Sequence, residues 1–293
     1  MNFRNMMFSA VAACTAVCTV SADEIPIKSG ETVAFLGDSI TELGTKNKIG
    51  YVNLVVDGLF RAGIDVKPVP AGISGNNSNH MLARVDRDVI SKKPNWMFLS
   101  CGVNDAPNGL TGGDCNPGVP LETYSKNITA ILDKCAEAGI QVIVLTATPV
   151  VEDPDHVANK NLVPYNEFLR KIATQKKLKL IDLNKVFNSY IATKKNKKAL
   201  ELTIDGTHMS PYGDIMMASA ILNQLNLPEV IYRRCYEAWN NSIPAYTFKN
   251  MTIELTVAEM EKLDKIKTED CSPEEFMKLI IHERLKENEA VKP

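Results

Sequence analysis

The sequence predicts an α/β fold in which helices cover both faces of a parallel sheet, and three observations lead to this prediction. Short, β-rich apolar runs alternate with amphipathic segments over most of the chain. The runs are nearly continuous in apolar character, which is typical of parallel strands buried on both faces. The chain has 293 residues, of which 45% are hydrophobic and 23% charged. Such a chain suits one globular domain with extensions.

The strands and helices follow one another in a βαβα order. We expect strands at Thr32–Leu36, Val66–Pro70, Trp96–Ser100, Gln141–Thr146 and Lys179–Asp182, of which the second is weak. Helical periodicity lies between them, at Tyr51–Ala62, Asn79–Ile90, Leu121–Ala138, Pro164–Lys176 and Asn184–Ala192. Ligands in such sheets bind beyond the carboxyl ends of the strands, so functional residues are sought there.

A further helix is predicted at Tyr212–Leu225, because Ser210 is suited to cap it and Pro211 to its first turn. After Pro228 the chain becomes rich in Glu and Lys. Helices are expected there at Val257–Lys267 and Pro273–Lys286, with a short strand at Thr252–Leu255. The expected organisation is a main domain over residues 23–228 and a mostly helical extension over 229–293, packed on that domain. A separate partner-binding module is the alternative.

The N-terminus resembles a secretory signal peptide over residues 1–22. Arg4 supplies a positive charge, an apolar stretch follows, and Val20-Ser21-Ala22 provides a small-residue cleavage site after Ala22. The apolar stretch is too short to span a bilayer stably. We therefore expect an exported protein, periplasmic or secreted and bacterial. Acylation at Cys14 as a lipoprotein and a retained apolar anchor are the alternatives.

Charge and cysteine content restrict the partners further. The net charge of −2 arises from 33 basic and 35 acidic residues without long blocks of one sign, which argues against nucleic acid and membrane surfaces as partners. Five cysteines remain after signal removal, an odd number: Cys101, Cys115, Cys135, Cys235 and Cys271. A bridge between Cys235 and Cys271, one between Cys101 and Cys115, and buried free thiols all stay open.

Four short polar stretches lie where the chain leaves a predicted strand or enters a helix. They are Gly37-Asp38-Ser39, Ala71–Asn76, Gly102–Asp105 and Asp205–His208. Each by itself is ordinary turn or cap chemistry. Together they supply every group that acyl transfer to a serine requires.

Ser39 is the candidate nucleophile and His208 the base that removes its proton, with Asp205 orienting the imidazole. The candidate oxyanion donors are the backbone N–H groups of Ser39 and Gly75 and the side-chain amide of Asn104. Asp38 is expected to support its loop without entering the reaction.

These four blocks resemble, in order and spacing, those of the GDSL or SGNH hydrolase family over about Glu31–Leu227. Ile40 stands where the family's motif has Leu, an apolar exchange. The resemblance implies a three-layer α/β/α sandwich of flavodoxin-like type, the residue roles just given, and neither metal nor cofactor. It also implies hydrolysis of carboxylic esters, of small molecules or of polysaccharides.

Within that range we favour a carbohydrate O-acetylesterase, because the protein is expected to be exported and because a polar, Gly-rich loop at Ala106–Pro120 follows the third block. A lysophospholipase or thioesterase, acyl transfer to an alcohol, and a carbohydrate-binding protein that has lost activity are the alternatives. The oligomeric state does not follow from the sequence.

Three histidines are set aside. His80 is interpreted as a solvated residue at a helix start, and His282 as a surface residue. His156 lies in Glu152-Asp153-Pro154-Asp155-His156, whose spacing matches no defined metal site, so a solvated loop is expected. Asn76-Asn77-Ser78 is a glycosylation pattern whose glycan would crowd Gly75, which favours bacterial export.

Overall fold

A computed structural model of the protein describes residues 25–107, 118–194 and 200–242. The chain divides into two compact units, Met1–Ile243 and Pro244–Pro293, and the described residues all belong to the first. The expected signal peptide and the segments expected at 252–255, 257–267 and 273–286 lie outside the described residues.

The centre of the described unit is a five-stranded sheet with the order β2-β1-β3-β4-β5, in which every neighbouring pair is parallel. Its strands are β1 (Thr32–Gly37), β2 (Lys67–Gly72), β3 (Trp96–Ser100), β4 (Gln141–Leu145) and β5 (Lys179–Ile181). All five predicted strands are therefore present. β1, β3 and β4 are almost wholly buried, whereas β2, with Pro68 and Pro70, is an edge strand, where the missing proline N–H groups are tolerated.

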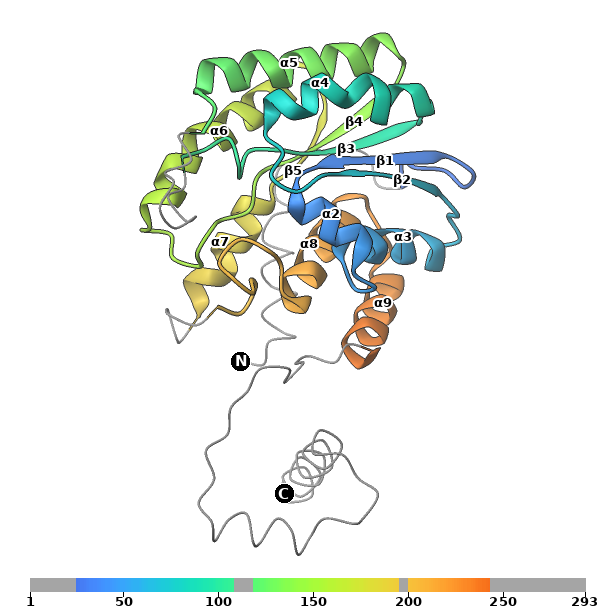
Figure 1. The fold of residues 1–293 in the computed structure, drawn as a ribbon. Helices are drawn as coiled ribbons and strands as arrows, with labels where there is room; N and C mark the ends of the chain where they lie inside the picture. The colour runs from blue at the N-terminus through green and yellow to red at the C-terminus, as the bar shows by residue number, and fades with distance from the viewer. Residues whose placement is uncertain (1–24, 108–117, 195–199, 243–293) are drawn as a thin grey trace, which may run out of the picture. The chain divides into compact units, whose positions relative to one another are not determined.

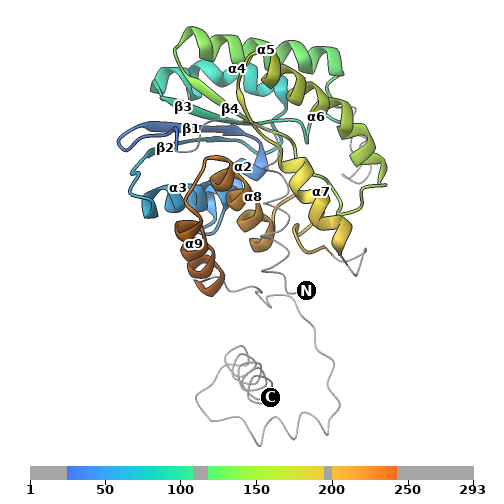
Figure 2. The same ribbon diagram turned by 180° about the vertical axis from the view of Figure 1, so that it is seen from behind.

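Helices cover both faces of this sheet, so the predicted three-layer α/β/α sandwich is confirmed (Figures 1 and 2). On one face lie α4 (Ser78–Asp88), α5 (Leu121–Glu137) and α6 (Val157–Gln175). The short 3-10 helix η1 (Ile90–Lys92) follows α4. On the other face lie α2 (Ser39–Lys46), α3 (Tyr51–Arg61), α7 (Leu183–Thr193), α8 (Pro211–Gln224) and α9 (Glu229–Ser242). Figure 2 shows the same division from behind.

Helix α9 was not placed by the sequence analysis, and two other helices differ from its prediction. Helix α2 was not expected, because Gly-Asp-Ser reads as a turn; the Asp38 side chain instead caps a helix by accepting a hydrogen bond from the Ile40 N–H (2.9 Å). Helix α6 was expected to start at Pro164, since proline favours first turns. It starts at Val157, capped by the His156 side chain, and Pro164 lies in its interior.

The strand order places a topological switch point beside β1. From β1 the chain passes to β2 on one side and then to β3 on the other, so the loops at their carboxyl ends diverge around β1. The Phe35 and Phe98 rings of β1 and β3 stack at a centroid distance of 5.0 Å, which packs the two central strands together. Ser39 follows directly on this rigid central strand.

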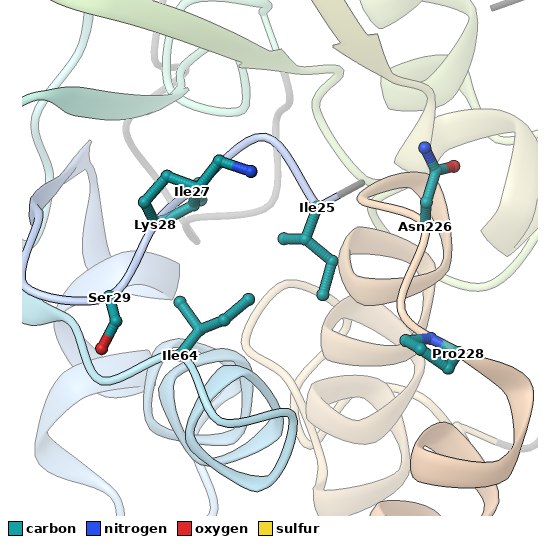
Figure 3. Close-up of a pocket in the computed structure, with 7 residues that line it drawn as sticks. All are labelled: Ile25, Ile27, Lys28, Ser29, Ile64, Asn226 and Pro228. Carbon is teal, nitrogen blue, oxygen red and sulfur yellow. The ribbon is translucent and has the colours of Figure 1, made fainter. Parts of the chain in front are cut away.

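The opposite end of the sheet carries a small pocket, shown in Figure 3. It lies where the chain enters β1 and β2 and where it leaves α8, and its volume is 270 Å³. Its lining residues are Ile25, Ile27, Lys28, Ser29, Ile64, Asn226 and Pro228. The pocket is therefore remote from the carboxyl ends of the strands. Across residues 25–107, 118–194 and 200–242, no helix combines the length and apolar character needed to cross a bilayer.

Candidate active site

Ser39 lies at the junction of β1 and α2, as the first residue of the helix. An N–H in the first turn of a helix has no intrahelical partner, so the Ser39 N–H points out of the helix end. The junction is tight: a Cβ on Gly37 would lie 2.0 Å from the Thr41 Oγ1. The backbone φ of Gly37 is not in the left-handed region, so its conformation does not require glycine. Glycine is required because any side chain would prevent the close approach of α2 to the strand end.

Asp205 and His208 lie on the loop that leads into α8, and they form a hydrogen-bonded chain with Ser39. The His208 Nδ1 is 2.6 Å from the Asp205 Oδ2, and the His208 Nε2 is 2.9 Å from the Ser39 Oγ. The Asp205 Oδ1 also accepts from the backbone N–H groups of Thr207 (2.9 Å) and His208 (2.8 Å). The structure thus brings together three residues that the sequence separates by up to 169 positions.

The hydrogen bonds to Asp205 determine its charge state. Partial burial opposes ionisation of the carboxyl group, but the hydrogen bonds from the His208 side chain and from the two backbone N–H groups outweigh this effect. They hold the pKa of Asp205 below its usual value. Asp205 is therefore an anion at neutral pH, with one oxygen on the loop backbone and the other on the imidazole.

Gly75 and Asn104 come from the loops that follow β2 and β3. Gly75 has a φ of 75°, a left-handed conformation that favours glycine. The Asn104 side-chain amide donates to the Asn76 carbonyl at 3.0 Å, which joins the two loops next to Gly75. On the other side, Ser74 donates its backbone N–H (2.7 Å) and its hydroxyl group to the Glu42 carboxylate of α2.

The buried Arg84 of α4 is a supporting residue that the sequence analysis missed. Its guanidinium donates to the Gly37 carbonyl (2.9 Å), the Ala71 carbonyl (2.9 Å) and the Asn76 Oδ1 (2.7 Å). It thus ties the ends of β1 and β2 to the loop that carries Gly75. An arginine in an amphipathic helix is indistinguishable by pattern from a solvated one, so no sequence signal identified it.

Two buried carboxylates lie beneath the site. Burial, with a smaller contribution from the nearby Asp105, raises the pKa of Asp38 to about 6, against the hydrogen bond from the Ile40 N–H. Asp105 accepts from the Ser78 N–H at 2.9 Å and from the Cys101 thiol at 3.3 Å. The contact of Asp38 is thus a helix cap on α2, where the sequence analysis expected support of a loop.

The cysteines and the other histidines are not among the residues of the proposed site. Cys101, Cys135 and Cys235 are buried free thiols, whereas Cys115 and Cys271 lie outside the described residues. His80 is exposed, as predicted, and takes part in the capping box of α4. His282 lies outside the described residues.

The prediction of a solvated loop at 152–156 is correct for Asp153 and Asp155 but wrong for Glu152, which is buried. Among the described residues, no group of three or more His, Cys, Asp or Glu side chains is arranged to hold a metal ion.

Comparison with known proteins relates this geometry to esterases. A family model described as the GDSL-like Lipase/Acylhydrolase family matches residues 35–214. An acetylxylan esterase of Geobacillus stearothermophilus is 26% identical over 213 residues, which cover 68% of this chain and 95% of that protein. The lipoprotein YqeF of Bacillus subtilis strain 168, described as uncharacterized, is 27% identical over 175 residues, covering 52% of this chain and 70% of that protein.

Solved structures give the same relation. The acetylxylan esterase Axe2 from Geobacillus stearothermophilus has 26% identity and a TM-score of 0.61, covering 68% of this chain and 95% of that one. An acetyl xylan esterase named AlAXEase has 29% identity and a TM-score of 0.59, covering 66% of this chain and 98% of that one. The similarity thus extends over nearly the whole length of both enzymes.

Proposed function

This chain belongs to the GDSL-like lipase/acylhydrolase family, and we propose that it is an exported serine esterase that removes acetyl groups from carbohydrates. Family membership and the acetylxylan esterase relatives make it a carboxylic ester hydrolase. The assignment of the reacting residues and of the acetylated carbohydrate is the proposal. The observation that carries it is the hydrogen-bonded chain from Asp205 through His208 to Ser39.

In the proposed reaction, the Ser39 Oγ forms a bond to the ester carbonyl carbon while its proton passes to the His208 Nε2. The negative charge that develops on the carbonyl oxygen is stabilised by the N–H groups of Ser39 and Gly75 and by the Asn104 amide. The C–O bond to the alcohol then breaks, and the alcohol takes the proton from His208. Water, deprotonated by His208, attacks the acyl-enzyme and releases the carboxylic acid and the free Ser39 hydroxyl.

The exposure of the site supports a substrate ester on a large alcohol. The side chains of His208 and Asp205 are 30% and 49% exposed, so both remain accessible beside the buried nucleophile. An acetyl group attached to a polysaccharide can approach such a site while most of the polymer remains in solvent. The relatives named acetylxylan esterases support the same substrate class.

Export is proposed on the signal-like N-terminus, and the relative described as a lipoprotein supports it. Fractionation of cells that express the full-length chain tests this part of the proposal. We expect the protein outside the cytoplasm and shortened by cleavage after Ala22, as measured by mass spectrometry. A cytoplasmic protein with an intact N-terminus would contradict it.

The substrate is tested with a chain-length series of p-nitrophenyl esters beside acetylated xylan and acetylated pectin. We expect the acetyl ester to be the best of the series and free acetate to be released from at least one glycan. A preference for decanoyl esters without acetate release from glycan would exclude the carbohydrate esterase. The variant Ser39→Ala serves as the control for background hydrolysis.

A further inference from the structure

Glu152 is a buried carboxylate in the connection between β4 and α6, outside the four motif blocks. Its Oε2 is 2.6 Å from the Lys194 Nζ at the end of α7. The two side chains are 2% and 0% exposed, respectively. A buried ion pair is costly unless further hydrogen bonds satisfy the remaining polar atoms. The hydrogen bonds to the other carboxylate oxygen, Oε1, therefore indicate the role of the ion pair.

The Glu152 Oε1 accepts hydrogen bonds from one continuous segment of the chain. The donors are the backbone N–H groups of Glu201 (2.8 Å), Leu202 (2.6 Å) and Thr203 (2.9 Å), together with the Thr203 hydroxyl (3.1 Å). Three successive N–H groups that converge on one oxygen form an anion-binding nest. Hydrogen bonds to an ionised acceptor are stronger than neutral ones, so the nest fixes this backbone segment firmly.

That segment is the base of the loop that carries Asp205 and His208. Thr203 pairs with Met209 in an isolated antiparallel bridge, and the Ile204 N–H donates to the His208 carbonyl at 2.9 Å. The tip of the loop is held as well, because the Val151 N–H donates to the Gly206 carbonyl at 2.6 Å. Glu152 thus holds the base of the loop and Val151 holds its tip. Because Ile204 and Asp205 are exposed, these hydrogen bonds and not buried side chains fix the loop.

We propose that Glu152 is a positioning residue that sets the Asp205–His208 pair relative to Ser39, with Lys194 neutralising its charge inside the protein. This inference rests on the proposed roles of Ser39, Asp205 and His208. The acceptor at the base of the loop fixes the backbone from which both side chains project. Its loss displaces the imidazole from the Ser39 hydroxyl without altering any group that touches the substrate. A misplacement of about 1 Å costs about 10²-fold in rate.

The test compares two double variants that both remove the buried charges. Glu152→Leu with Lys194→Met leaves the three N–H groups without an acceptor and leaves no unpaired buried charge. Glu152→Gln with Lys194→Met keeps a neutral oxygen acceptor for the loop. With p-nitrophenyl acetate, we expect the first pair to lose about 10²-fold in kcat with KM changed less than about threefold. The second pair should recover most of that loss but remain several-fold below the parent, because a neutral oxygen is a weaker acceptor than a carboxylate.

A spectroscopic readout separates positioning from a merely structural role. The short Asp205–His208 hydrogen bond should give a far-downfield proton resonance in the parent protein. This resonance should shift or broaden in the leucine pair. In the glutamine pair it should lie closer to its position in the parent. The control is Asp182→Asn. Asp182 also accepts from a backbone N–H, a hydroxyl and a cation, those of Lys185, Thr146 and Arg170, but away from this loop. The Asp182→Asn variant should change thermal stability and leave kcat and the downfield resonance as in the parent.

A folded leucine pair that keeps both kcat and the downfield resonance would overturn the proposal. If the leucine pair does not fold, the glutamine pair decides: a several-fold loss of kcat at constant KM with a shifted resonance supports the proposal, and parent values of both overturn it. The Ser39→Ala control separates this from failure of the proposed function, because parental activity in that variant refutes the nucleophile. The resonance is measured without turnover and is therefore independent of that outcome.

Discussion

At the scale of single residues, three side chains have different roles in the proposed reaction, and their replacement should affect the rate to different extents. Ser39 forms the covalent bond and His208 transfers every proton, whereas Asp205 only orients and stabilises the imidazole. The loss of Asp205 should therefore be less severe than the loss of the other two.

We predict that Ser39→Ala and His208→Ala each abolish turnover, whereas Asp205→Ala leaves measurable activity, reduced by about 10⁴-fold. The initial rates with p-nitrophenyl acetate measure this order, and circular dichroism checks that each variant is folded. Residual activity in His208→Ala equal to that of Asp205→Ala would contradict the assignment of the base.

A second prediction concerns Asp38, whose pKa burial raises to about 6 in the folded protein from 3.8. The folded state then binds more protons than the unfolded state between these pH values, so the free energy of unfolding falls as the pH rises through this window. The penalty is fully present above pH 6 and amounts to about 3 kcal/mol. Asn in place of Asp38 keeps an oxygen acceptor for the Ile40 N–H and removes the charge.

The variant Asp38→Asn should therefore gain stability relative to the parent as the pH rises from about 4 to 7, by up to about 3 kcal/mol. Urea unfolding of both proteins at several pH values measures the difference. A difference that stays constant over this range would show that Asp38 titrates at its ordinary pKa.

At the scale of elements, α2 links the nucleophile to the loop that carries Gly75. The helix begins at Ser39, and one turn later its Glu42 accepts two hydrogen bonds from Ser74 and one from Lys46. Those bonds hold the pKa of Glu42 near 2, mainly through Lys46 and then Ser74, so the carboxylate is ionised at any working pH. The proposed nucleophile and the loop of a proposed oxyanion donor are thus fixed to the same short helix.

We predict that Glu42→Ala reduces kcat about 10-fold with little change in KM, because Gly75 loses its fixed position while the donor itself remains. Steady-state kinetics with p-nitrophenyl acetate measure both constants. Lys46→Ala is the matched control, since it removes another partner of the same carboxylate and leaves the contact with Ser74. Equal losses in the two variants would show that the ion pair between Glu42 and Lys46, and not the contact of Glu42 with the loop, matters.

The elements also show what the sequence could predict. Apolar runs identified β1, β3 and β4 clearly, because burial on both faces leaves a strong compositional signal, whereas the exposed edge strand β2 gave only a weak one. The strand ends placed Ser39, Gly75 and Asn104 at one edge of the sheet. Helix α2 was missed because Asp38 serves equally as a turn residue and as a helix cap. Arg84 and Glu152 were missed because their partners are mainly backbone groups remote in sequence, for which no local pattern exists.

At the scale of the whole molecule, the parallel strand order brings the residues of the proposed site together, and α9 packs on the helical layer that contains α3 and α8. The strand order brings loops from β1, β2 and β3 to one switch point, and α8 presents the fourth loop to them. Helix α9 packs on α3 and α8 within the unit Met1–Ile243. Its inner face consists of the buried Tyr232, Cys235, Tyr236 and Trp239.

The last prediction compares a chain that ends at Ser242 with one that ends at Pro228. Each large buried apolar side chain contributes about 1.5–3 kcal/mol, so the loss of α9 removes several kcal/mol from a total that is about 5–15 kcal/mol for most proteins. It also removes the hydrogen bond from the Trp239 indole to the Asp57 Oδ2 (2.7 Å), and it exposes the faces of α3 and α8 to solvent. The shorter chain should therefore unfold at a much lower temperature or aggregate.

Thermal unfolding of the two chains, followed by circular dichroism, measures this difference, and Trp239→Ala in the longer chain should reproduce part of it, about 3–5 kcal/mol. The chain that ends at Ser242 retains α9 and all the residues of the proposed site, so it should keep its esterase activity. Equal unfolding temperatures for the two chains would mean that α9 is dispensable and that the sheet with α2 to α8 is a complete folding unit. A lower temperature for the shorter chain would show that α9 belongs to the folding unit of the esterase.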